Sequence, residues 1–190
     1  MRRKLLLSLI LLAVHSIAWA QGTAYAKLTN GDEVSWAAIQ GTISDTEIAD
    51  IRGFQLTGVL DLSQVYTDEG GTGTALRVTS IDSFMLCDDM TGVTIPSSVT
   101  SIGSGAFREC RALTSLDIPS SVTTIGSDVF SECTALVSVT LPTTITSIGR
   151  SMFSNCSSLA SVTIPSGVTT IDSYAFHGCT SLEGITIPAN

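Results

Sequence analysis

The chain carries few side chains of the kinds that hold metals or perform catalysis. Of its two histidines, only His177 lies beyond the first 20 residues, which excludes a site built from several histidines. A Cys/His nucleophilic pair would need an accessible thiol, whereas the nearby Cys179 is predicted to be buried. Asp117 has no evident second carboxylate for acid–base chemistry. The sequence therefore predicts no catalytic residue, no cofactor and no metal site, and we expect that the protein is not an enzyme.

Positive charge is also scarce. Beyond residue 20 the chain has 17 acidic and 6 basic residues, because Arg2, Arg3 and Lys4 account for three of the nine basic ones, and the formal net charge is then −11. Lys27 is the only lysine of this part. Such a chain should repel nucleic acids and anionic membrane surfaces. We therefore expect neither as a partner.

A long hydrophobic run occurs only at the N-terminus. Three basic residues precede a mostly apolar run over 5–14, and Ala18-Trp19-Ala20 follows. This order is typical of a secretory signal peptide, and the run is too short for a good membrane span. The sequence predicts cleavage after Ala20 and a mature protein, without a membrane span, that is secreted or held at the cell surface.

The chain does contain a motif that recurs every 23 residues. All five prolines and all five cysteines follow this interval: Pro96, Pro119, Pro142, Pro165, Pro188, Cys87, Cys110, Cys133, Cys156 and Cys179. A fixed period of this length indicates a solenoid, in which each repeat is one coil that packs on its neighbours. We divide the chain into a signal peptide (1–20), an N-terminal cap with one short helix (21–79) and five repeats (80–190).

Each coil combines two spacings of apolar residues. Leu116-Asp117-Ile118 alternates inward and outward as a strand does, and the proline that follows ends the strand. Phe107, Cys110 and Leu113 are three residues apart, which suits a short helical or 3₁₀ turn. The predicted fold class is α/β leaning to β, a solenoid with short parallel strands and short helical or 3₁₀ turns.

The five cysteines occupy equivalent positions of successive coils. Stacked coils lie about 4.8 Å apart, whereas a disulfide needs Cβ atoms about 3.8 Å apart on converging side chains. We therefore expect buried thiols that act as small hydrophobic side chains. The alternative is a metal or redox ladder.

The cap does not repeat, and we expect it to cover the apolar end of the solenoid. Ser44 and Glu47 have the spacing of a capping box, and Ile43 can pack on Ile48 as a hydrophobic staple. These residues predict a helix over 45–52.

The coil resembles the BspA-like leucine-rich repeats of bacterial surface proteins. Their pattern is roughly L-x-x-[LVI]-x-[IL]-P-x-x-[VI]-x-x-I-G-x-x-A-F-x-x-C, and residues 113–133 and 136–156 match it closely. The segments 41–52 and 60–63 also resemble the N-terminal segment of that family. The resemblance implies a leucine-rich-repeat solenoid and adhesion to host matrix proteins or to other cells.

Two surfaces are candidate binding sites. The first is the concave sheet face, which the resemblance implies is the usual binding surface, and its residues are Ser115, Asp117, Ser138, Thr140, Ser161 and Thr163. The second is an outer ridge on the helical side of the coils, and its residues are Arg108, Arg111, Tyr174 and His177. The alternative for each is a solvated surface without a ligand.

The sequence thus predicts an exported protein that presents a rigid surface to host matrix, cell-surface protein or glycan, in an adhesion-like role. The alternative is a structural spacer or self-assembly module without a specific ligand. The chain stops at Asn190, directly after a repeat strand. We therefore expect that it is part of a longer protein, or that two such ends meet in an end-to-end homodimer.

Overall fold

The computed structural model describes residues 22–44, 47–85 and 87–188, and within these residues it contains strands and no helix. The N-terminal strands are β1 (Gly22–Asn30), β2 (Glu33–Ser44), β3 (Glu47–Phe54), β4 (Gly58–Tyr66), β5 (Arg77–Val78) and β6 (Ser80–Met85). The remaining strands are β7 (Met90–Thr94), β8 (Ser101–Ile102), β9 (Ser115–Asp117), β10 (Thr124–Ile125), β11 (Ser138–Thr140), β12 (Ser147–Ile148), β13 (Ser161–Val162) and β14 (Thr170–Ile171). The predicted signal peptide lies outside the described residues. No helix of the described part could cross a membrane.

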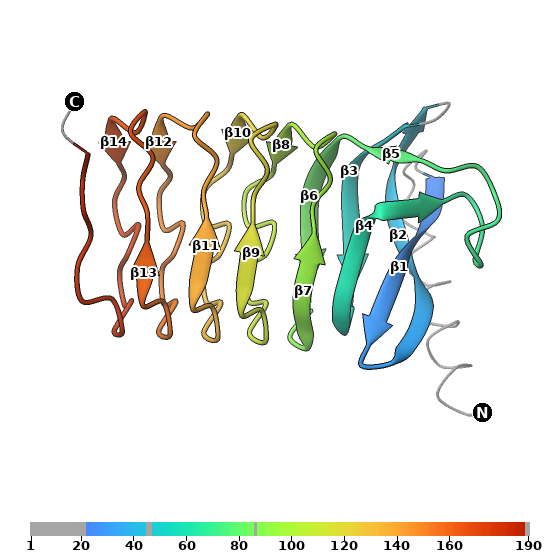
Figure 1. Ribbon diagram of the computed structural model, residues 1–190, viewed down its shortest axis with the longest axis horizontal. Helices are drawn as coiled ribbons and strands as arrows, with labels where there is room; N and C mark the ends of the chain where they lie inside the picture. Colours follow the sequence, from blue (N-terminus) through green and yellow to red (C-terminus); the bar gives the residue numbers. More distant parts are fainter. Residues whose placement is uncertain (1–21, 45–46, 86, 189–190) are drawn as a thin grey trace.

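The coils stack side by side, so that strands of equivalent position form parallel sheets along the solenoid (Figure 1). One row of strands, β9, β11 and β13, forms a three-stranded sheet, and β12 pairs with β14 on the other side of the coils. The largest sheet has the order β10-β8-β6-β3-β2-β1-β4-β7, with β5 pairing on β3. The prediction of short parallel strands is therefore confirmed.

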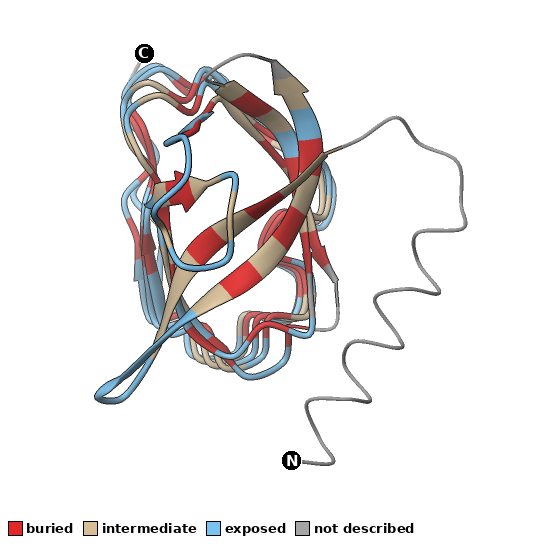
Figure 2. Ribbon diagram, turned by 90° about the vertical axis from the view of Figure 1, so that its right-hand side faces the viewer, coloured by how far each residue is buried: buried red, intermediate tan, exposed pale blue. Residues whose placement is uncertain are grey.

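The hairpin of β1 and β2 closes the N-terminal end of the stack. It joins the two sides of the solenoid, because β2 pairs with β3 on one side and β1 pairs with β4 on the other. Figure 2 shows the two strands running across the end of the coils. Their inward residues, Ala24, Ala26, Ala37 and Ile39, are buried. The cap thus covers the apolar end with a sheet.

The predicted helix over 45–52 is wrong from residue 47 onward, because that segment forms β3, and residues 45–46 lie outside the described part. Ile43 and Ile48 do meet, but as cross-strand partners of β2 and β3. Asp50 has a φ of 51°, which interrupts the alternation, so that Ile48 and Ile51 are both fully buried. This spacing of three imitates one face of a helix. Pairing of β3 with strands on both sides outweighs the local capping pattern, because tertiary contacts decide the state of so short a segment.

The segments between the two strands of each coil are turns, so the predicted helical or 3₁₀ turns are not confirmed. Some bonds do join residues three apart, such as the bond from Cys110 N–H to Phe107 O at 3.1 Å. However, Gly105 and Glu109 have φ values of 67° and 62°, and this left-handed region cannot continue a right-handed helix. Phe107 N–H instead donates to Val129 O of the next coil at 3.0 Å. The turns therefore bond between coils as well as within them.

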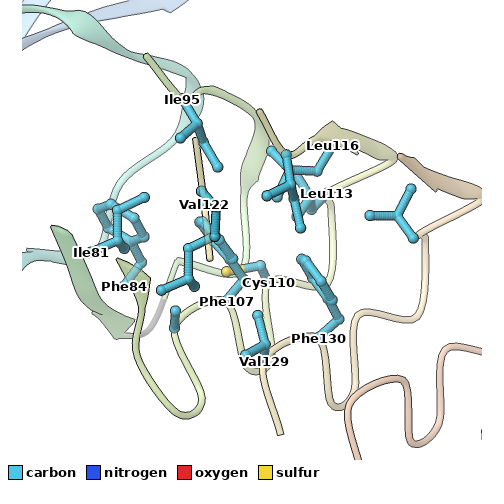
Figure 3. Packing of buried hydrophobic residues seen from close by; sticks show 14 of the residues in the cluster. Ile81, Phe84, Ile95, Phe107, Cys110, Leu113, Leu116, Val122, Val129 and Phe130 are labelled. Carbon is cyan, nitrogen blue, oxygen red and sulfur yellow. The ribbon is translucent and has the colours of Figure 1, made fainter. Parts of the chain in front are cut away.

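The core consists of apolar columns that run along the solenoid (Figure 3). One column is a stack of five phenylalanine rings with centroids 5.3 to 5.8 Å apart: Phe84, Phe107, Phe130, Phe153 and Phe176. The first four are fully buried and Phe176 is half-buried. Burial of one such side chain stabilises a fold by about 1.5–3 kcal/mol. Because Phe107, Phe130 and Phe153 each stack on a ring on both sides, the coils depend on one another for their stability.

The cysteines form a second column, and the prediction of thiols without disulfides is confirmed. Cys133 Sγ donates to Phe107 O and Cys156 Sγ donates to Phe130 O, both at 3.0 Å. Burial raises the pKa of Cys87 to about 11 and that of Cys156 to about 12. The thiols are therefore protonated near neutral pH, and those of Cys133 and Cys156 link their coils to the preceding ones.

Candidate binding site

The six residues predicted on the concave sheet face lie together on one side of the solenoid. The parallel register places Ser115 opposite Ser138 and Asp117 opposite Thr140, and it continues from Ser138 to Ser161. Thr163 follows β13, and all six residues are exposed. The residues between them in the strands, Leu116, Val139 and Val162, are buried. We call the outward side of β4, β7, β9, β11 and β13 the front face.

The front face extends onto the cap, where the sequence analysis missed two residues. The register of β4 with β7 places Val59 opposite Gly92 and Asp61 opposite Thr94. The face therefore carries two rows: Val59, Gly92, Ser115, Ser138 and Ser161 in the first, and Asp61, Thr94, Asp117, Thr140 and Thr163 in the second. Leu60-Asp61-Leu62 resembles Leu116-Asp117-Ile118, and this likeness is the feature of the sequence that could have revealed the extension.

An open groove of about 400 Å³ lies on the front face, lined by Val59, residues 91–95 and residues 115–117. It coincides with an interruption of the sheet, since β7 ends the largest sheet and β9 begins the next one. Gly92 stands in the row where the next three strands carry serine. A Cβ atom at Gly92 would meet only Val59, at 3.5 Å or more. The missing side chain therefore leaves the floor of the groove open.

Hydrogen bonds hold both carboxylates of the second row. Thr140 Oγ1 donates to Asp117 Oδ1 at 2.6 Å. Asp61 Oδ1 accepts from the N–H and Oγ of Ser63 at 2.9 and 2.6 Å, and its Oδ2 accepts from Gln64 Nε2 at 2.8 Å. Ion pairs do not orient these carboxylates, since neither carboxylate forms one within the described residues. Neutral donors therefore orient both carboxylates, and Asp117 is exposed while Asp61 is half-buried.

The outer ridge is split into two separate pairs of residues. Arg111 contacts Asp88 at 2.8 Å, Glu109 at 2.9 Å and Glu132 at 3.6 Å, so it connects successive coils. Arg108 lies 3.5 Å from Glu109.

The second pair of the ridge is aromatic. Tyr174 is 61% exposed and meets His177 edge to face, with ring centroids 5.8 Å apart. The positions between Arg108 and His177 in this column are Ser131 and Ser154, and both are buried. The structure therefore does not bring the four ridge residues together.

An aromatic cluster on the outward side of the cap was also missed. Trp36 meets Tyr66 edge to face with centroids 5.4 Å apart, and Tyr25 lies opposite Tyr66 in the register of β1 and β4. The loop at Gly71 packs against the Trp36 ring. The sequence did not reveal this cluster, because its three aromatic residues come from three strands and are not regularly spaced along the chain.

Residues 79–190 match the family described as BspA type Leucine rich repeat region, in six copies. The chain belongs to this family. The predicted family is thereby confirmed, with six matched copies in place of the five predicted repeats.

Solved structures of other leucine-rich repeat proteins share the fold of this BspA-type chain. A leucine-rich repeat protein of T. pallidum is 22% identical, with a TM-score of 0.59 over 84% of this chain and 81% of that one. One from Eubacterium ventriosum is 23% identical, with a TM-score of 0.57 over 80% of this chain and 38% of that one. The chain thus spans well under half of the second protein. At these identities the similarity shows the fold alone. No curated protein is significantly similar in sequence.

The exposed groups on the front face of this BspA-type chain suit non-covalent binding. Its thiols are buried or half-buried, and burial raises their pKa values. Within the described residues, no three His, Cys, Asp or Glu side chains are grouped to hold a metal ion. The front face instead offers hydroxyl groups, two carboxylates and an open groove. These groups suit hydrogen bonding and charge recognition.

Proposed function

We propose that this protein is exported and binds a protein or glycan outside the cell through its front face, in an adhesion-like role. The observation that supports the proposal is the register of Ser115, Asp117, Ser138 and Thr140, which are exposed on adjacent strands above buried residues. A face that is already ordered loses little conformational entropy on binding. Weak contacts can therefore add along successive coils.

The test is a binding screen of residues 21–190 against extracellular-matrix proteins and a glycan array. We expect saturable binding that soluble ligand competes away. Thr140→Lys places a long charged side chain in the second row and should weaken binding about tenfold or more. Ser147→Lys is the matched control, since Ser147 is exposed on β12 of the same coil but outside the front face. Equal losses in both variants, or none in Thr140→Lys, would contradict the front face as the site.

The outer ridge is the second surface that we propose for a partner. Its exposed guanidinium groups and the exposed Tyr174 are side chains of the kinds that dominate binding energy at interfaces. The double variant Arg108→Ala and Arg111→Ala tests the first pair. Arg111 has three carboxylate neighbours, so its loss could disturb the fold. The circular dichroism and melting temperature of the double variant must therefore match those of the parent protein. Lost binding with retained fold, together with normal binding of Thr140→Lys, would assign the partner to the ridge.

Self-assembly is the alternative function, and a specific observation favours it. The last described coil exposes apolar side chains, with Ile171 37% and Ile187 66% exposed. Edge-to-edge or end-to-end pairing would bury these side chains. Sedimentation velocity over a range of concentrations tests this function, and Ile187→Glu should shift the protein towards monomer. A monomer at all concentrations would contradict it.

A further inference from the structure

The groove beside Gly92 differs chemically from the rest of the front face. Three first-row residues line it: Val59, which is 38% exposed, Gly92, which has no side chain, and Ser115. On β11 and β13 the same row is hydroxylated, with Ser138 and Ser161. The groove therefore combines a short apolar floor with polar walls, which no other described part of the front face does.

One carboxylate, that of Asp117, lines the groove, and a second, that of Asp61, belongs to the neighbouring strand β4. Asp61 on β4 and Asp117 on β9 lie in the second row, with Thr94 of β7 between them. Lys27 lies opposite Asp61 on β1, which pairs with the edge of β4 away from β7, so its backbone lies outside the segment between Asp61 and Asp117. Asp117 is the one charged residue among those that line the groove, and the net charge beyond residue 20 is also negative, at −11.

We propose that this groove binds one lysine or arginine side chain of an extended peptide segment in a partner protein. The aliphatic stem would lie over Val59 and Gly92, and the cationic group would lie between Asp61 and Asp117. Long basic side chains bind in this way because the stem is apolar while the head remains hydrated and charged. The proposal rests on the proposed function and names the partner chemistry of the same face.

The size and charge of the groove select this occupant. A volume of about 400 Å³ is at the low end of ligand sites, which span about 300–1,000 Å³, so the groove suits a single side chain. An acidic side chain would meet two like charges, and a purely apolar side chain would leave both carboxylates without a counter-charge. Neighbouring Ser115 and Ser138 can then bond the backbone of the same peptide segment.

The test uses isotope-labelled residues 21–190 and the peptide Ac-Ala-Ser-Lys-Ser-Ala-NH2, followed by NMR amide shifts. Two further peptides replace lysine by norleucine, which keeps the stem, and by glutamate. We expect shifts at Gly92, Thr94 and Asp117 with the lysine peptide. Affinity should fall about three- to fivefold with norleucine and disappear with glutamate. The affinity for the lysine peptide should also fall as ionic strength rises from about 0.01 M to about 1 M.

Matched variants locate the site. Gly92→Val fills the floor, and its Cβ makes only ordinary contact with Val59, so we expect a folded protein with at least about tenfold weaker binding. Gly184→Val is the control, because Gly184 lies at the equivalent position two coils beyond Ser138, with nothing within 4 Å of its Cβ. Asp117→Thr introduces the residue found at Thr140 and Thr163 and should remove the preference for lysine over norleucine.

Several results would overturn the inference. These are equal binding of the lysine and norleucine peptides, shifts confined to another surface, a glycan that shifts these amides when the peptide does not, and unchanged affinity in folded Gly92→Val. If Gly92→Val binds the peptide with unchanged affinity but the matrix screen finds a partner, the groove is contradicted and the proposed function remains intact. A positive peptide titration without any partner in that screen would support the groove and contradict the adhesion-like role.

Discussion

Thr140 Oγ1 donates a hydrogen bond of 2.6 Å to Asp117 Oδ1, and the two residues occupy the same place in consecutive coils. The bond crosses from β9 to β11 on the exposed front face. Because both side chains are exposed, water competes for the bond, and it orients the carboxylate more than it stabilises the fold.

We therefore expect Thr140→Val, which keeps the shape and removes the hydroxyl, to lower the free energy of unfolding by no more than about 1 kcal/mol. Urea unfolding measures this change. Thr163→Val is the control, since Thr163 stands in the same row of the next coil and is also exposed. A loss of several kcal/mol in Thr140→Val alone would show that the bond is structural.

The phenylalanine stack should be the largest single contributor to stability. Phe130 lies 5.8 Å from Phe107 and 5.4 Å from Phe153. We expect Phe130→Ala to cost about 3–5 kcal/mol, because it removes a buried ring and leaves a cavity. Phe176→Ala should cost less, since Phe176 is half-buried and only Phe153 stacks on it within the described residues. Chemical denaturation measures both losses of stability. Equal losses in Phe130→Ala and Phe176→Ala would contradict a stack in which a ring gains stability from a neighbour on each side.

The buried thiols should make the fold sensitive to alkali. Burial raises the pKa of Cys87 to about 11 and that of Cys156 to about 12, from an ordinary value of 9.0. Above pH 9.0 a thiol of the unfolded chain ionises while the folded one stays protonated, so ionisation favours unfolding. The stability is complete below that pH and is lost as the pH rises towards 12.

Urea unfolding at about pH 7.5 and about pH 10.5 measures this loss, which should be about 1–2 kcal/mol for a buried thiol. Cys156→Ala should flatten the pH dependence. Cys179→Ala should flatten it less, since Cys179 is only half-buried. If Cys156→Ala keeps the full dependence on pH, the Cys156 thiol is not among its causes.

The contact between Gly71 and Trp36 can be measured with a matched pair of substitutions. Gly71 has a φ of 69°, and a Cβ atom there would lie 2.3 Å from the Trp36 ring. Gly31 has a φ of 61° and open space around it. Both substitutions to alanine should cost about 1 kcal/mol for the left-handed backbone, and Gly71→Ala should cost at least about 1 kcal/mol more for the clash.

Tryptophan fluorescence reports on this site directly, because Trp36 is the only tryptophan beyond residue 20. We expect a shifted emission maximum in Gly71→Ala and an unchanged one in Gly31→Ala. Equal stability of the two variants would show that the loop does not rest on Trp36.

Most of the repeat region could be predicted because each coil repeats the same constraint. Phe107, Cys110, Leu113 and Leu116 are buried as expected, and the outward residues of β9 and β11 are exposed as expected. The helical turns could not be excluded by spacing alone. Left-handed residues such as Glu109 preserve the spacing of three while breaking the helix, and φ is not visible in a pattern of apolar positions.

The cap was predicted in its role but not in its structure. Ser44 and Glu47 have the local spacing of a helix start, yet the segment from residue 47 forms β3 between β2 and β6. Local propensity is worth a fraction of a kcal/mol per residue, whereas pairing on two sides satisfies the backbone of the whole strand.

The sequence by itself determined the 23-residue register, the apolar columns and the exposed hydroxyl rows. These features follow from which side chains recur and from whether each side chain is apolar or polar, because apolar surface is removed from water on folding. Only the tertiary structure decided where the groove lies. Val59 and Gly92 become neighbours because the β1–β2 hairpin crosses the end of the stack and sets β4 beside β7. That contact joins a non-repeating segment to a repeating one, and no period in the chain encodes it.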